Sequence, residues 1–176
     1  MRQTTGSTTA PASTLWRCGG RQCGAGECEH EEGELHRHAS GPGPQHAPAI
    51  VHEVLGSVGA PLPADVRMHM ERRLGHYFAD VRIHTGDRAA ESAAAVHADA
   101  YTVGRQVVFE SGQFDPTSSS GRRLLAHELT HAAGAAPGTP RPVGPLRVSN
   151  PDEPAERHAE SASHLAARDG AVTPSV

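Results

Sequence analysis

The sequence His127-Glu128-Leu129-Thr130-His131 holds the side chains best suited to chemistry in this chain. Two histidines four positions apart on an α-helix project from one face, so both imidazoles can bind one zinc ion. The glutamate between them would stand beside the ion, where it can act as a general base on a water molecule. Because so short a motif can arise by chance, the interpretation needs a helix, a third ligand and a surface for substrate.

The surrounding residues predict the required helix. Serines at 118–120 are candidate N-caps, residues 121–133 contain no proline, and Gly134 is a termination signal. Leucine and alanine fall on one arc of this helix, and both histidines with the glutamate fall on the adjoining arc. The helix can therefore pack on one side and bind a metal on the other. The alternative is a core helix whose histidines only hydrogen-bond nearby groups.

A catalytic zinc ion usually takes three protein ligands and keeps one position for water. A second helix is predicted from about residue 152 to residue 167, with a stripe of alanines that would let it approach the first. That approach would bring Glu156, followed one turn later by Glu160, to the histidine pair. His164 stays open as an alternative ligand, whereas His158 falls on a different side of the helix. Without the upstream motif, a solvated face would be the simpler explanation of both glutamates.

Several segments resemble one protein family in the same order. They are residues 61–63, 70–71, 81–85, 98–104, 107–109 and 124–130, followed by 156–160. Over roughly residues 50–134 the chain resembles the core domain family associated with extracellular contractile injection systems (eCIS). The resemblance implies a minimal zincin-like fold and a Zn²⁺ cofactor. It also implies a site of gluzincin type, in which a downstream glutamate is the third metal ligand.

Carried over residue by residue, the resemblance makes His127, His131 and Glu156 the metal ligands and Glu128 the catalytic base. Glu160 takes the place of a family aspartate that orients a histidine ligand from outside the metal shell. Its longer side chain changes its reach toward His131. The chain also departs from the family in having His158 in place of a glutamate and no glutamine-rich segment after residue 131.

The composition argues against other classes of protein. All sixteen basic residues are arginine, the net charge is −4 and no basic stripe is present, so nucleic acid is not expected as a partner. No apolar run is long enough to span a membrane, and residues 1–12 lack the regions of a signal peptide. A cytoplasmic location is therefore the default expectation, with export through an injection system left open.

Three regions are expected along the chain. Residues 1–48 read as a disordered tail, 49–170 as the zincin-like eCIS core domain, and 171–176 as a disordered C-terminus. The tail carries Cys18, Cys23 and Cys28, which with His30 could form a structural metal site or remain exposed to oxidation.

The domain is predicted to be α+β, with a small and mostly antiparallel sheet. Helices are expected at 64–74 and 88–97, a strand at 80–85, and a hairpin joining 100–103 to 106–110. The segment 107–110 is the expected sheet edge for binding substrate, with a core hairpin as the alternative. Three side chains are considered for stabilising the oxyanion of a peptide under attack: His84, Tyr101 and Arg105.

These expectations together predict a zinc-dependent metallopeptidase of gluzincin type, associated with a bacterial contractile injection or toxin delivery system. Its partners would be a protein or peptide substrate, including injection-system components or cargo. The opposing hypothesis is a non-catalytic zincin-fold module that docks or loads cargo. A third treats the histidine motif as coincidence and predicts no bound metal.

Overall fold

The computed structural model describes residues 17–18, 21–22, 33–136, 138, 142 and 144–166, which fall in two units, 1–31 and 32–176. In the first unit, strands β1 (Arg17–Cys18) and β2 (Arg21–Gln22) pair antiparallel. The predicted cysteine metal site, which needs residues 23, 28 and 30, lies outside the described residues, as does the predicted disordered C-terminus at 171–176.

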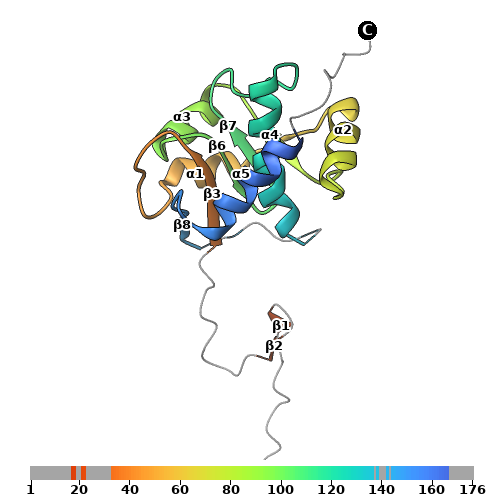
Figure 1. The fold of residues 1–176 in the computed structure, drawn as a ribbon. Helices are drawn as coiled ribbons and strands as arrows, with labels where there is room; N and C mark the ends of the chain where they lie inside the picture. Colours follow the sequence, from red (N-terminus) through yellow and green to blue (C-terminus); the bar gives the residue numbers. More distant parts are fainter. Residues whose placement is uncertain are drawn as a thin grey trace, which may run out of the picture. The chain divides into compact units, whose positions relative to one another are not determined.

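Six described strands of the second unit form one mixed sheet in the order β4-β5-β7-β6-β3-β8. Strands β7, β6, β3 and β8 are labelled in Figure 1. The strands are β3 (Gly33–Ala39), β4 (Ala60–Pro61), β5 (Arg82–His84), β6 (Ala98–Val103), β7 (Gln106–Phe109) and β8 (Leu146–Val148). Three pairings are antiparallel, whereas β5 pairs with β7, and β3 with β8, in parallel. The predicted α+β class and the β6–β7 hairpin are confirmed.

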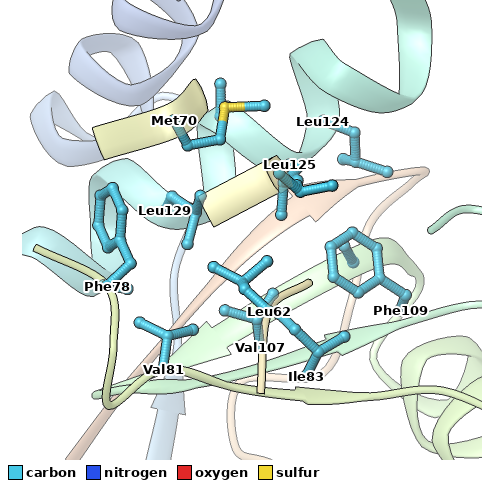
Figure 2. Packing of buried hydrophobic residues seen from close by; sticks show 14 of the residues in the cluster. Leu62, Met70, Phe78, Val81, Ile83, Val107, Phe109, Leu124, Leu125 and Leu129 are labelled. Carbon is cyan, nitrogen blue, oxygen red and sulfur yellow. The ribbon is translucent and has the colours of Figure 1, made fainter. Parts of the chain in front are cut away.

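Among the residues that the structure describes, five helices cover both faces of this sheet. They are α1 (Ala49–Gly56), α2 (Ala64–Leu74), α3 (Asp87–Ala95), α4 (Ser119–Gly134) and α5 (Pro154–Ala166). Helices α1 and α3 share one apolar core with Tyr101 and Val108. Helices α2 and α4 share another with Val107 and Phe109 (Figure 2). Neighbouring β7 residues serve opposite cores because successive strand side chains point to opposite faces.

The expectation that residues 1–48 form a disordered tail is wrong for residues 33–39. These residues form β3, an interior strand between β6 and β8. Leu35 is fully buried, and Arg37 is only 3% exposed. The Arg37 side chain donates to the carbonyl oxygens of residues 41, 96, 97 and 149, so its burial leaves the guanidinium satisfied. The folded domain therefore begins near residue 33 rather than at 49.

The expected substrate edge is also wrong. Strand β7 lies between β5 and β6, so both of its sides are already hydrogen-bonded. The edge strands are β4 and β8. The outer side of β8 bonds the segment before α1, because the Val148 amide donates to Gln45 and the Ala47 amide to Leu146. Within the described ranges, no helix has both the length and the apolar character needed to cross a membrane.

Candidate metal centre

The position of the two histidines follows from how helix α4 begins and from which of its faces packs in the core. The Ser118 hydroxyl accepts a hydrogen bond from the Gly121 amide at 3.0 Å, which confirms one of the predicted N-caps. A Cβ atom on Gly121 would meet the backbone oxygen of Asp115 at 2.0 Å, so this turn requires glycine. Leu125 and Leu129 pack into the core against the sheet (Figure 2). The neighbouring arc, with the histidines, is left to face α5.

Three atoms from α4 and α5 converge on one point. The Nε2 atoms of His127 and His131 lie 3.1 and 3.0 Å from Oε2 of Glu156, and 3.2 Å from each other. The three side chains are only 3–5% exposed. Tetrahedral zinc with bonds of about 2.0–2.1 Å needs ligand atoms about 3.3 Å apart. Two imidazoles and one carboxylate at this spacing fit a zinc ion.

The Glu156 carboxylate is oriented by two segments, one just before α5 and one far away in the sequence on β3. Its Oε1 accepts hydrogen bonds from the Ser149 hydroxyl at 2.6 Å and the Arg37 amide at 3.3 Å. This leaves Oε2 for the histidines, as expected for an outer shell that aims a metal ligand. Burial alone would raise the pKa of Glu156, but its contacts with the histidines outweigh burial and hold the pKa well below its usual range.

The pKa values of the two histidines shift in opposite directions. Burial lowers the pKa of His131. Burial acts in the same direction on His127, but the surrounding carboxylates of Glu156, Glu128 and Glu160 outweigh it and raise the pKa of His127. The carboxylates of the cluster therefore favour positive charge at His127.

Glu128 lies beside the cluster in the interior of the domain. Its side chain is fully buried, and its Oε2 accepts a hydrogen bond from the Thr102 hydroxyl on β6 at 2.7 Å. Its Oε1 is buried and has no hydrogen-bond partner among the described residues. Burial raises the pKa of Glu128 to about 7. A carboxylate with this pKa and one free oxygen is suited to accept and release a proton near neutral pH.

Glu160 lies next to a different histidine from the one expected. Its Oε2 is 3.6 Å from Nδ1 of His127, the ring nitrogen that faces away from the cluster, whereas His131 was the predicted partner. The turn of α5 that follows Glu156 lies beside the earlier of the two histidine turns of α4, which explains the change. His164, the alternative ligand, is 57% exposed and contacts Glu160 at 2.9 Å instead.

Strand β3 adds two histidines that the sequence analysis missed. The His36 ring stacks on His131, with centroids 4.3 Å apart and planes within 4°. One His36 nitrogen lies within 4.8 Å of ligand atoms of both His131 and Glu156. His38 meets His127 edge-on at 5.2 Å. The signal was the alternation of these histidines with Leu35 and Arg37, which places them together on the α4 face of a strand.

The three side chains considered for the oxyanion are bonded elsewhere. Tyr101 belongs to the opposite core, and its hydroxyl bonds Ser92 at 2.7 Å. His84 contacts Gln106 at 2.7 Å and Ser57 at 3.2 Å. Arg105 donates to the carbonyl oxygens of Ala135 and Tyr77 at 3.0 and 2.9 Å. In the part of the chain that the structure describes, these bonds direct all three away from the cluster.

A cavity of about 240 Å³ borders the cluster on the His127 side. His38, Asp99, Arg123 and Glu160 contribute to its wall. Space for a bound molecule thus exists next to His127, although the three clustered side chains are buried.

Comparison with known proteins supports the family resemblance over one segment of the chain. Residues 61–138 match the family model of the eCIS core domain. The match contains the histidine motif of α4, but β3, Ser149 and Glu156 lie outside it. No curated protein and no solved structure matches the chain. From β4 to the end of α4, the chain therefore resembles the eCIS core domain family, as its sequence predicts.

Proposed function

We propose that this chain is a zinc-dependent metallopeptidase with a zincin-like domain and a gluzincin-type site, acting in association with a contractile injection system. The observation that carries the proposal is the convergence of Glu156 Oε2 with Nε2 of His127 and His131 at 3.0–3.1 Å. Two imidazoles and a carboxylate are a ligand set typical of catalytic zinc, which keeps a further position for water.

In this proposal three side chains bind the metal and a fourth, Glu128, transfers the proton. When bound by His127, His131 and Glu156, zinc would polarise a peptide carbonyl and lower the pKa of a water molecule toward about 7. Glu128 would take a proton from that water on Oε1 and later give it to the leaving amine. The hydrogen bond from Thr102 holds Oε2, so that Oε1 remains available. Burial favours the protonated form of Glu128, which supports its uptake of a proton from water.

The proposed partners follow from the family match. Because residues 61–138 resemble the eCIS core domain, the substrate would be a protein or peptide encountered in such a system. Three sources fit: a component of the apparatus, a cargo protein, or a protein of the target cell.

The direct test combines metal content with one substitution. Wild type and Glu128→Gln are purified, zinc per chain is measured, and cleavage of an unfolded, labelled casein is followed. We expect about one zinc per chain in both proteins, and loss of cleavage in Glu128→Gln of the order of 10²-fold or more, because the general base is lost. Glu91→Gln on α3, at the opposite face of the sheet, is the control.

A second function is favoured by the depth of the site. Glu128 is fully buried and the three ligands are 3–5% exposed, which leaves little surface for selecting a substrate. This supports a non-catalytic module in which zinc stabilises a docking domain. Stoichiometric zinc with equal, negligible cleavage by wild type and Glu128→Gln would favour this function over the peptidase.

A further inference from the structure

The cavity beside His127 carries an excess of negative charge. Three carboxylates and one guanidinium contribute to its wall, from Asp99, Asp115, Glu160 and Arg123. With the histidines neutral, the wall that the described residues form therefore has a net charge of −2. A concave wall of one sign attracts ligands of the opposite sign. The charge of this cavity therefore favours a cationic ligand.

The excess negative charge lies at the end of the cavity next to His127. Glu160 Oε2 is 3.6 Å from Nδ1 of His127, and Asp99 Oδ2 is 3.4 Å from Nδ1 of His38. The two imidazole rings meet edge-on at 5.2 Å, so both carboxylates lie beside this pair of rings. The guanidinium and the third carboxylate come from α4 and the segment before it, and their opposite charges offset each other.

Hydrogen bonding at this end of the cavity is incomplete. The Nδ1 atoms of His38 and His127 are buried, and neither has a hydrogen-bond partner in the described part of the chain. His127 is only 4% exposed, and it lines the cavity. Unsatisfied buried polar atoms are uncommon and call for a reason. A bound group that donates hydrogen bonds to Asp99 and Glu160 would place each carboxylate between a ring N–H and the ligand.

The size and the apolar part of the wall suit a single long side chain. Pockets for whole small molecules usually measure about 300–1,000 Å³, whereas this cavity measures about 240 Å³. Leu124 contributes an apolar side chain to the same wall. Lysine and arginine combine an apolar stem with a cationic head, so the stem can contact Leu124 while the head meets the carboxylates.

We propose that this cavity binds a lysine or arginine side chain of the peptide substrate next to the bond that is cleaved, and that Asp99 and Glu160 select for it. This inference rests on the proposed peptidase function and names a class of substrate for it. The cavity borders His127, one of the three proposed metal ligands, so a residue held there lies close to the bond presented to the metal.

Matched peptides test the preference. Each carries one variable residue, arginine, lysine, norleucine or glutamate, in the middle of an uncharged alanine and serine sequence. Acetylated and amidated ends make the variable residue the only charged group, so an N-terminal amine cannot take its place. We expect wild type to cleave the arginine and lysine peptides with kcat/KM about tenfold above that of norleucine, as two solvent-accessible ion pairs allow. Mass spectrometry should place the cuts beside the basic residue.

Asp99 is the residue to replace, because Glu160 also contacts His127 and its loss would disturb a proposed metal ligand. Asp99→Asn should reduce the arginine-to-norleucine ratio by about three- to fivefold, as for loss of one accessible ion pair. Asp99→Glu keeps the charge and should keep most of the ratio. Asp87→Asn is the control, since Asp87 begins α3, which packs in the opposite core, and the ratio should change by less than about twofold.

Salt separates charge from shape. Raising sodium chloride from about 0.05 M to about 0.5 M should lower the arginine-to-norleucine ratio of wild type, because accessible charges are screened. The same rise should have little effect on the ratio in Asp99→Asn. A ratio that salt leaves unchanged in wild type would overturn selection by the carboxylates.

Binding without turnover gives an independent readout. The affinity of the fluorescein-labelled peptides for zinc-loaded Glu128→Gln is measured by fluorescence anisotropy, alone and combined with Asp99→Asn. Arginine and lysine should bind more tightly than norleucine, and Asp99→Asn should remove most of the difference. Equal cleavage of the arginine and norleucine peptides by wild type would overturn this inference and retain the peptidase. Absent cleavage with a binding preference that depends on Asp99 would reject the peptidase and retain the cation site.

Discussion

The central segment, residues 61–138, and the flanking segments contribute different parts of the candidate metal centre. The central segment provides His127, His131 and the buried Glu128 on one helix. The flanks provide Glu156 from α5, and Ser149 and the Arg37 amide that aim it. A match to the central segment therefore identifies the histidines and the base but not the complete site. We therefore expect flanking substitutions to act on the anchoring of β3 and on the orientation of Glu156, and central ones to act on contacts within α4 and on Glu128.

The largest expected effect is on the free energy of unfolding, and it comes from replacing Arg37 on β3. Its guanidinium bonds the backbone of segments 59 and 112 residues away along the chain, whereas the buried Arg122 of α4 bonds only carbonyls five and six residues away. We expect Arg37→Ala to lower the free energy of unfolding by about 3 kcal/mol, because several buried carbonyls lose a charged donor.

Arg122→Ala, the central counterpart, should cost about 1 kcal/mol. Urea unfolding of the two variants measures both values. Equal losses would mean that β3 is no more important to the domain than a local contact within α4.

Ser149 gives the next largest effect, on metal affinity. Its hydroxyl bonds Oε1 of Glu156 at 2.6 Å, so Ser149→Ala should weaken zinc binding by about 10- to 100-fold. Thr102→Val is the central counterpart, because Thr102 bonds the base rather than a ligand. It should leave zinc affinity unchanged and lower cleavage. Competition with a chromogenic chelator measures the affinities, and equal values in Ser149→Ala and wild type would contradict the outer-shell role of Ser149.

The smallest effect is expected at the junction of β8 and α5. Arg147 bonds Glu153 at 2.7 Å and holds the pKa of that carboxyl at about 2. A lowered pKa means that the pair stabilises the fold above the ordinary pKa of glutamate and that this stabilisation is lost as the pH falls toward 2. The effect should stay below about 1 kcal/mol, because the pair is solvent-accessible.

Thermal unfolding of wild type and Arg147→Gln between pH 2 and 7 checks this prediction. The difference in melting temperature should be present at pH 7 and should shrink in acid. A difference that grows as the pH falls would show that the ion pair is not its source.

Helices whose signals lie within a few neighbouring residues could be predicted from the sequence. The spacing of Val66 and Met70 predicted α2, and the serine cap with the glycine stop predicted α4 within two residues. The approach of Glu156 to the histidines was also predictable, because it followed from a periodic alanine stripe on α5.

Strand β3 could not be predicted in this way. Its burial depends on Arg37 finding carbonyl partners in segments that only the complete fold brings together. A strand containing glutamate, arginine and two histidines resembles a solvated tail until those partners are known. The placement of β7 in the interior was missed for a related reason, since the parallel partner of a strand is not encoded in the strand itself.

The contact between the Arg37 amide and Glu156 joins residues 119 positions apart. Closing so long a loop costs conformational entropy before the contact can stabilise the fold. During synthesis the histidine pair leaves the ribosome before its carboxylate, so the three-residue cluster cannot form until Glu156 has been made. We therefore expect a chain shortened before residue 156 to bind zinc more weakly than a chain that contains Glu156.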